Sequence, residues 1–431
     1  MDNRNIEYQL NNLFKNRLSE IQNGSSELMN ARRQEAMTRV VEQGLPTKSV
    51  ERYRQTDIRS MYNSDSELVL SAGETDCQTG QLPIESIRVE LCNGIYVADE
   101  KLTVTEQGVV LGSLAAATRD YQQIVEKYLN SLADNGDVVS DLNTAFVKDG
   151  FFLYVPSGVE VELPVSVVES YCTQGPSSTF GRMLMAFEAN SKCTIVLDLR
   201  SGCSQQVTNN SVREIFVESG ANVNIVEVQR FSAEMKNVTT TFVSQAEDSS
   251  VKSVSLTIDG GVVRNNWNVK LNGRGADNQT FGLALSNQTQ HIDYCTNIEH
   301  ISSDATSRQK FKSTASDCGR VVFNGRIYVA QDAQRTQAFQ ENRNLLMSDS
   351  AKIYAKPQLE IYADDVKCSH GATVGQLNAE EIYYMRQRGL SEADAKRLQV
   401  YGFVNEIISR VDNPKLTELL NELATAKIER M

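Results

Sequence analysis

The sequence predicts a mainly β protein: a solenoid of stacked strands flanked by helical segments at both ends. Apolar residues follow helical spacing near both ends of the chain, and this spacing is lost between residues 150 and 358. In that central region, short stretches rich in Val, Ile, Thr and Phe alternate with polar turns that recur along the chain. We therefore expect an N-terminal helical (α+β) domain over 1–149 and a β-helix core over 150–358. The end of the β-helix and a C-terminal helical domain should follow over 359–431.

Composition excludes several classes of function. The chain has 431 residues, 40% of them hydrophobic, and a formal net charge of −12, as expected of a folded soluble protein of more than one domain. It has no apolar run of about 18 residues, and its first residues lack the apolar stretch of a secretory signal. An acidic balance also argues against a nucleic-acid or anionic-membrane surface. We expect a cytoplasmic protein that binds neither nucleic acid nor membrane.

Eight cysteines are scattered at wide intervals without a CxxC pair. This pattern predicts reduced thiols, not a disulfide framework. Most of them lie inside apolar strands and are expected in the core. They are Cys77, Cys92, Cys172, Cys193, Cys203, Cys295, Cys318 and Cys368.

In the N-terminal region, apolar spacing predicts helices around 10–21 and over about 27–43, the second ended by Gly44. A further helix is predicted over about 115–133, and the segment 142–156 ends the region in a strand.

Between the first helices and the strands, Arg52, Tyr53 and Arg54 stand together. We interpret this segment as a solvated loop anchored by its aromatic ring, in preference to a binding surface.

In the central region, a small or acidic turn followed by a strand recurs. The interval between successive turns is roughly 26 to 31 residues in the first part of the region and roughly 13 to 17 in the later part. We interpret the longer interval as two rungs of a solenoid and the shorter one as a single rung. Alternation in most strands predicts one face inside the solenoid and the other outside. An immunoglobulin-like pair of sandwiches would also give short strands with regular turns. The solenoid is preferred because Trp267 is the only Trp and no Cys…Trp…Cys spacing exists. The turns lie at Asn190, Ala221, Glu247, Ala276, Asp304, Asp317, Asp332 and Asp349.

Three short amphipathic helices are predicted after Gly371. Asn378 and Ser391 are placed to cap the first two, and Asn413-Pro414 separates the third. These helices could close the open end of the solenoid, or they could offer a groove to a partner.

The candidate metal site is the pair Cys368 and His370, which stand two residues apart. In an extended segment both side chains point to the same side. Thiolate and imidazole bind iron and other soft or borderline metals. One chain thus supplies two ligands, whereas a closed metal site usually takes four. Taken alone, the pair is equally typical of a buried thiol beside a hydrogen-bonded histidine.

A second group, His291, Cys295 and His300, has irregular spacing that would place His300 on the opposite strand face from the other two. A structural role is favoured for it.

Motifs for nucleotide chemistry and hydrolysis are missing: the sequence contains no GxxxxGK[ST], GxGxxG after a strand, HExxH or GxSxG. The chain is therefore not expected to hydrolyse nucleotides, and any energy input must come from a partner.

The run KPQLEIYADDVKCSHGATVGQLNAEEIYYMRQRGLSEADAKRL, over 356–398, closely resembles the most characteristic block of the SufB/SufD family of SUF iron–sulfur cluster assembly proteins. GLPT with the later Glu51 and Thr56, LNTAF, GRVVFNGRIYV and Asn-Leu-Leu agree with other blocks of the family. The Cys-Ser-His-Gly-Ala-Thr form is similar to the SufD branch, because the SufB branch typically has acids in place of Ser369 and Gly371. The N-terminal cysteine cluster of SufB is also missing, while Tyr53 replaces the Trp of many SufD chains.

The resemblance implies a right-handed parallel β-helix and a non-catalytic scaffold that supports iron acquisition and cluster assembly in a SUF complex. It implies a SufB-like paralogue as one partner and a SufC-like ABC-type ATPase as the other. His370 matches a histidine thought to line the interface with SufB, and Cys368 matches the neighbouring cysteine. No cofactor is expected to bind stably to this chain alone; iron or a nascent cluster would be held transiently. The ATPase is expected at the C-terminal helices, around Tyr383, Tyr384, Arg386, Leu398 and Tyr401.

Two rival functions remain open at this point. A β-helix can also carry a polysaccharide-active enzyme, but such enzymes are usually secreted. The chain could alternatively be a structural homodimer that pairs through the edge of its β-helix, and a homodimer is also possible when the partners are missing.

Overall fold

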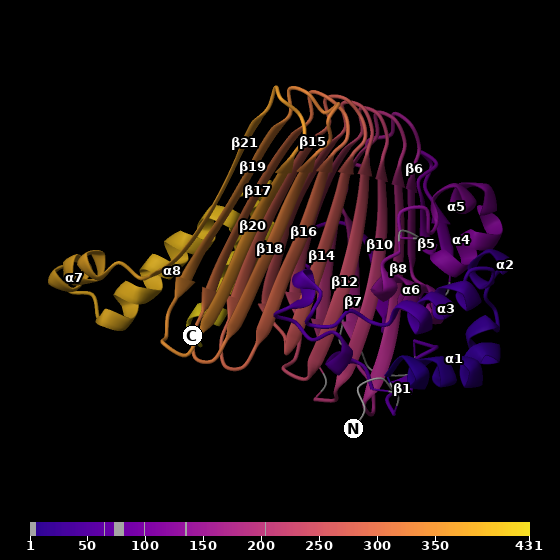
Figure 1. The fold of residues 1–431 in the computed structure, drawn as a ribbon, viewed down its shortest axis with the longest axis horizontal. Coiled ribbons are helices and arrows are strands. Elements are labelled where there is room, and N and C mark those ends of the chain that lie inside the picture. Colours follow the sequence, from indigo (N-terminus) through magenta and orange to yellow (C-terminus); the bar gives the residue numbers. More distant parts are fainter. Residues whose placement is uncertain (1–5, 64, 73–81, 99, 134–135, 203) are drawn as a thin grey trace.

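The computed structural model describes residues 6–63, 65–72, 82–98, 100–133, 136–202 and 204–431, so Cys77 and Cys203 lie outside the described part of the chain. Its core is a β-solenoid made of two long sheets, with helices at both ends of the chain (Figure 1). This confirms the predicted fold class. No helix among these residues combines the length with the apolar character that a membrane crossing requires.

Successive strands of the solenoid alternate between the two sheets, which we call sheet A and sheet B. Each strand pairs in parallel with the strand two positions along the chain, from β6 and β7 onward. Sheet A contains β20 (Lys352–Ile361), β18 (Arg320–Val329), β16 (His291–His300), β14 (Val262–Leu271), β12 (Met235–Gln245), β10 (Val207–Val217), β8 (Ser177–Phe187), β6 (Phe151–Val155), β5 (Val110–Ser113) and β4 (Leu102–Val104), and β1 (Glu67–Leu68) pairs with β8. Sheet B contains β21 (Lys367–Gln376), β19 (Gln337–Leu346), β17 (Thr306–Ala315), β15 (Asp277–Ser286), β13 (Ser250–Asp259), β11 (Asn222–Arg230), β9 (Lys192–Ser201), β7 (Val165–Tyr171), β2 (Ile87–Cys92) and β3 (Ile95–Tyr96).

The predicted rung length was wrong by a factor of two. Thr306 pairs with Asp277 on one side and with Gln337 on the other, so one full rung takes about 30 residues and contains two strands. The shorter spacing found in the sequence therefore measures one strand and its turn, which is half a rung. Periodicity alone reports how often a turn recurs and not how many turns complete a circuit. The parallel pairing also excludes the immunoglobulin-like sandwich, which is antiparallel.

Left-handed turns form a column along one side of the solenoid, where the small or acidic turns were predicted. Asn190, Asp248 and Asp304 have φ angles of 59°, 53° and 61°, and Gly220 and Gly275 have φ angles of 70° and 72°. Asn, Asp and Gly are the residues that tolerate this conformation. In each turn the backbone N–H donates to a carbonyl of the next rung, as from Asn190 to Ser219 at 2.9 Å. The turns therefore stack the rungs as well as reversing the chain.

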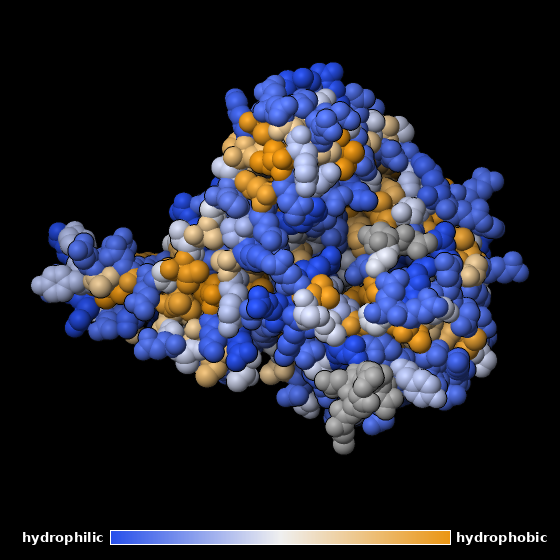
Figure 2. Space-filling model, in the orientation of Figure 1, coloured by the Kyte–Doolittle hydropathy of each residue, from blue (hydrophilic) through white to orange (hydrophobic). Residues whose placement is uncertain are grey.

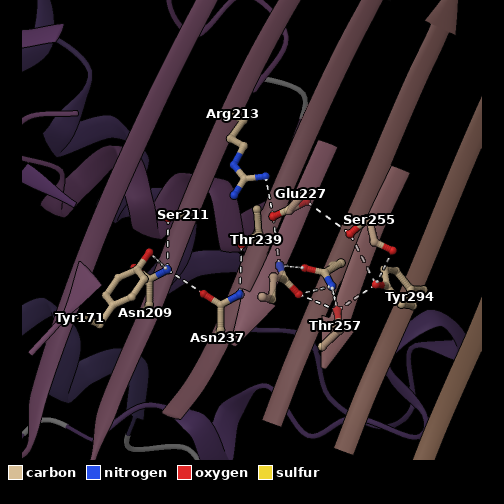
Figure 3. A network of polar contacts seen from close by, with 12 residues as sticks. Tyr171, Asn209, Ser211, Arg213, Glu227, Asn237, Thr239, Ser255, Thr257 and Tyr294 are labelled. Carbon is tan, nitrogen blue, oxygen red and sulfur yellow. Dashed lines mark hydrogen bonds and ion pairs between the residues drawn. The ribbon is translucent and has the colours of Figure 1, made fainter. Parts of the chain in front are cut away.

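The interior of the solenoid is only partly apolar, which the alternation of the sequence did not predict. Polar side chains from both sheets form a buried network between them (Figure 3). Asn209 donates to Asn237 at 2.7 Å, and Arg213 on sheet A pairs with Glu227 on sheet B at 3.0 Å. Buried polar groups of this kind are stable when they bond one another.

Helices of the N-terminal region cover the outer face of sheet A at its first rungs (Figure 1). They are α1 (Ile6–Gln22), α2 (Glu27–Asn30), α3 (Arg33–Gln43), α4 (Leu114–Asp120), α5 (Gln122–Tyr128) and α6 (Val138–Phe146). The predicted helix over 27–43 is split because Arg33 is buried and donates to the carbonyls of Ala145 and Val147 at 3.2 and 2.6 Å.

Two further corrections concern the same region. The helix predicted over 115–133 is broken at Tyr121 and ends at Tyr128, since the backbone N–H groups that follow bond the buried carboxylate of Glu214 instead. In the segment 142–156, residues 142–146 belong to α6, which Asp137 caps, and only 151–155 form a strand.

The three C-terminal helices are present as predicted, and the second ends at Ile408, before the predicted break at Asn413-Pro414. They are α7 (Ala379–Gln387), α8 (Glu392–Ile408) and α9 (Pro414–Ile428), capped by Asn378, Ser391 and Asn413. The buried sides of α8 and α9 pack on outward-facing residues of sheet B such as Val254 and Leu283. They therefore cover a side of the solenoid and leave its last rung open, while α7 projects away from it (Figure 1).

Candidate interface site at the open end of the solenoid

Cys368 and His370 lie on β21, the last strand of sheet B. The register pairs Cys368 with Ala338 and His370 with Gln340 on β19. Ala338 and Gln340 are buried in the interior, so both candidate side chains lie on the interior side of the last rung. The structure thus brings them together on one face, at the mouth of the solenoid.

The two side chains differ in environment. Cys368 is half-buried and packs against a small apolar cluster that includes Ile327, Val329 and Ala338. Burial raises the pKa of its thiol, and a hydrogen bond with the backbone of Ala338 lowers it. The thiol is therefore protonated at neutral pH, and a metal would have to displace its proton. His370 is exposed, so its imidazole is accessible at the open end.

The donor set at this end is partial. Among the residues that the structure describes, no group of three or more His, Cys, Asp or Glu side chains is arranged to hold a metal ion. Cys368 and His370 can supply two of the four ligands that a closed site usually takes. The remaining ligands would have to come from another molecule.

The strands that carry this pair end the two sheets. In the described chain, no strand pairs with the outer edge of β20 or of β21. A Cβ atom added to Gly371 or Gly375 would meet nothing within 4 Å, which shows how open β21 is. Exposed edges of this length are surfaces on which another chain can pair. Large apolar side chains are exposed beside the edges: Phe339, Tyr354, Ile361, Tyr362 and Val374.

The helices predicted to bind a partner present much of their apolar surface to solvent. Tyr383 and Tyr384 on α7 are 64% and 60% exposed, and Leu398 on α8 is 52% exposed. Arg386 pairs with Glu392 at 3.4 Å. Tyr401 differs, because it packs partly against the core under α8.

A groove of about 850 Å³ lies between α7, α8 and the end of β21. Its lining includes Leu377, Tyr384, Met385, Leu398 and Phe403. In the space-filling view, apolar side chains gather at the base of the arm that α7 and the start of α8 form (Figure 2). The groove and this apolar surface are accessible in the single chain.

The second group of the sequence, on β16, is not a site. His291 and Cys295 lie on the outer face of sheet A, whereas His300 lies inside, as the spacing predicted. His291 Nε2 and Thr56 Oγ1 are 2.8 Å apart, and His300 Nε2 is 2.8 Å from Ser307 Oγ. Burial lowers the pKa of both histidines, that of His300 to about 4. Both are neutral structural residues.

The prediction that the cysteines lie in the core holds for Cys193 and fails for Cys318. Cys193 is buried and free, as predicted for the core, and burial raises its pKa to about 12. Cys318 is also free but exposed.

The segment around Tyr53 is anchored by its aromatic ring, as interpreted, but the sequence did not reveal what the ring contacts. Arg52 and Arg54 are exposed, as a solvated loop predicts, but Tyr53 is only 3% exposed. The fully buried guanidinium of Arg264 lies over the Tyr53 ring, 4.1 Å from its centroid. The segment is therefore docked on the outer face of sheet A.

Its two family-matching residues make further contacts across that sheet. The hydroxyl of Thr56 donates to Asp293 on β16, and Glu51 forms an ion pair with Lys356 on β20. The segment thus links the N-terminal region to the next-to-last strand of the solenoid. The only signal in the sequence was the match of Glu51 and Thr56 to a family block.

Two family descriptions match almost the whole chain. "SUF system FeS cluster assembly, SufBD core domain" matches residues 171–403, and "SufBD protein N-terminal region" matches residues 4–167. The iron–sulfur cluster assembly SufBD family protein of Synechocystis is 30% identical over 324 residues, covering 73% of this chain and 71% of the relative. The iron–sulfur cluster assembly protein SufD of Escherichia coli is 29% identical over 386 residues, covering 87% of each chain. The SufD protein of Bacillus subtilis is 28% identical over 316 residues, covering 71% of each chain. The chain therefore belongs to the SufBD family of SUF-system iron–sulfur cluster assembly proteins.

Proposed function

We propose that this chain is a SufD-type, non-catalytic scaffold subunit of a cytoplasmic SUF complex. It supports iron acquisition and cluster assembly at an interface with a SufB-type paralogue, and a SufC-type ATPase drives the complex. The observation that carries this proposal is the partial donor pair, Cys368 and His370, on the open last rung.

The paralogue pairs with the free edges of β20 and β21. Edge pairing forms main-chain hydrogen bonds along ten-residue strands and covers the apolar side chains exposed beside them. It also places the partner's residues next to Cys368 and His370, where they complete the ligand set. Family membership supports this function over a polysaccharide-active enzyme.

Iron or a nascent cluster is cargo at this interface and not a resident cofactor. His370 is the firmer ligand because its imidazole is exposed. Cys368 becomes a second ligand only when a metal displaces the proton from its thiol, because burial raises the pKa of that thiol.

The ATPase docks on α7 and the start of α8. The exposed rings of Tyr383 and Tyr384 and the groove that ends at Leu398 form an apolar surface with a polar rim, which is typical of a helix-mediated interface. Because α8 packs on β15 and β17, movement of a bound ATPase reaches the sheet that carries Cys368 and His370.

Anaerobic reconstitution with the SufB-type and SufC-type subunits tests the metal site. His370→Ala is expected to reduce cluster formation by at least tenfold, and Cys368→Ala is expected to have a smaller effect. Ser369→Ala is the matched control, because Ser369 is exposed on the opposite face of the same strand. Full cluster formation by His370→Ala would remove this residue from the site.

Co-purification tests the ATPase surface. Replacing Tyr383 and Tyr384 together by Ala should abolish capture of the SufC-type subunit, since buried aromatic anchors dominate interface energies. Tyr8→Ala is the control, because Tyr8 is 61% exposed on α1 at the other end of the molecule. Unchanged capture by the double variant would place the ATPase elsewhere.

A homodimer is the second candidate, and the free edges of β20 and β21 favour it. Sedimentation of the isolated chain, with and without an excess of the SufB-type subunit, decides between the two. If the paralogue displaces the dimer, the homodimer and the paralogue use the same edges of β20 and β21. If the dimer persists while the paralogue is bound, they use different surfaces.

A further inference from the structure

Gln340 is the interior residue next to His370. It lies on β19, pairs with His370 in the parallel ladder, and is only 3% exposed beneath the last rung. Neighbouring side chains on the same face of a parallel ladder are within reach of each other. The Gln340 side chain is thus the polar group of the chain that stands directly behind the imidazole.

The amide of Gln340 has no hydrogen-bond partner among the residues that the structure describes, on either its nitrogen or its oxygen. This is unusual, because buried amides almost always bond. Gly325, opposite on β18, leaves the space that the amide occupies: a Cβ atom there would clash with the Gln340 nitrogen. The amide is therefore held in the interior with its donor and its acceptor both available.

The next rung inward provides a contrast. Gln309 pairs with Gln340 in the ladder and lies on the same interior row. Its carbonyl oxygen accepts a hydrogen bond from Thr296 across the solenoid at 2.8 Å. The oxygen of Gln309 is thus anchored to sheet A, although its amide nitrogen has no partner among the described residues, while neither amide atom of Gln340 is anchored. On the side of the open end, the ladder neighbour of Gln340 is His370, whose ring can both donate and accept.

We propose that Gln340 is a positioning residue for His370. Its amide bonds the imidazole, directly or through one water, and so selects which ring nitrogen carries the proton. The other nitrogen then presents its lone pair toward the open end of the solenoid. Histidine ligands of metals are commonly oriented by such a bond to the second ring nitrogen. The consequence for metal binding rests on the proposed function, but the bond itself does not.

The test is the tautomer of His370 in the isolated full-length chain, read from the ¹⁵N shifts of its ring at about pH 9. The chain has only three histidines, and His370→Ala assigns the signals. The wild type is expected to hold one dominant tautomer. Gln340→Met, which keeps the length of the side chain, should give the mixture of a free imidazole. Gln340→Glu retains an acceptor and should restore one dominant tautomer.

Gln309→Met is the matched control, with the same substitution on the same row one rung further from His370. It should leave the tautomer unchanged, and circular dichroism verifies that each variant is folded. A free-imidazole mixture in the wild type, or an equal effect of both Met substitutions, would overturn the proposal.

A second measurement separates this proposal from the function on which its consequence rests. In the reconstituted complex, Gln340→Met should weaken Fe²⁺ binding by about 10- to 100-fold. If the tautomer changes and Fe²⁺ affinity does not, the positioning role stands and the assignment of His370 as an iron ligand fails. If neither changes, the positioning role fails.

Discussion

Strands β10 and β21 are similar elements of one solenoid, yet they have opposite environments. Every residue of β10 is buried, on both faces, whereas all residues of β21 except Cys368 are exposed. The outer face of β10 is covered by α6 and the loop before it, and rungs stand on both of its edges. Among the described residues, β21 pairs with another strand on one edge only. The comparison teaches that the same kind of strand is closed by helices and neighbouring rungs in one region and stays accessible in the other.

The largest effect is expected from breaking the closed end. The carboxylate of Glu214 on β10 pairs with buried Arg182 at 2.7 Å and accepts from the N–H groups of Asn130, Leu132 and Ala133. Glu214→Ala removes the counter-charge of buried Arg182 and leaves the three backbone donors buried without this acceptor, and should lower the free energy of unfolding by about 3–5 kcal/mol. Urea denaturation measures this change. Glu160→Ala, which removes an exposed ion pair with Lys192, is the control and should shift the midpoint far less.

The next effect concerns the covered interior and its response to pH. Burial lowers the pKa of His300, inside β16, to about 4, whereas the unfolded chain has the ordinary value near 6.5. Stability from this group is therefore complete above about pH 6.5 and is lost as the pH falls toward 4, by on the order of 3 kcal/mol. His300→Gln should flatten the pH dependence of unfolding in this window. An unchanged slope would show that His300 is protonated in the fold.

A smaller effect is expected where α9 docks on the solenoid. Lys427 is fully buried, and its ammonium donates to Asp259, Asn287 and Gln290 at 2.8, 2.5 and 2.7 Å. Lys427→Met removes these bonds and should cost about 2 kcal/mol. Hydrogen exchange should quicken in α9 and not in α3, which packs at the other end. Uniform exchange through both helices would contradict a local role.

The smallest effect is expected at the open end. Val374 on β21 is 46% exposed, so Val374→Lys should change the free energy of unfolding by less than about 0.5 kcal/mol. The same substitution should prevent pairing, because a lysine on an edge strand opposes the addition of another strand. Gel filtration with the SufB-type subunit measures the loss of pairing, and urea denaturation measures the change in the free energy of unfolding. A large loss of stability would show that β21 is covered in the isolated chain.

Prediction from the sequence was most accurate where structure is local. The caps of α7 and α8 were placed correctly because the cap side chain bonds a backbone N–H within three residues of it. The left-handed turns at Asn190 and Asp304 were found because these residue types tolerate that backbone.

Errors arose where distant residues decide the outcome. The polar interior was missed because Asn209 and Asn237 have the pattern of outward-facing residues, although the ladder allows them to bond each other inside. The partner of the Tyr53 ring was missed because Arg264 lies far along the chain. The rung length was wrong because a turn in the sequence does not reveal how many strands complete a circuit.

The sequence by itself determined the strands, their turns, the helix caps and the placement of Cys368 and His370 on one face, since each depends on neighbours within a few residues. Tertiary structure alone decided that these two side chains stand at an open end, with Gln340 behind the imidazole and α8 packed on the outer face of the same sheet. These relations join residues that are 30 or more positions apart, through the register of the rungs, and local preferences cannot specify that register.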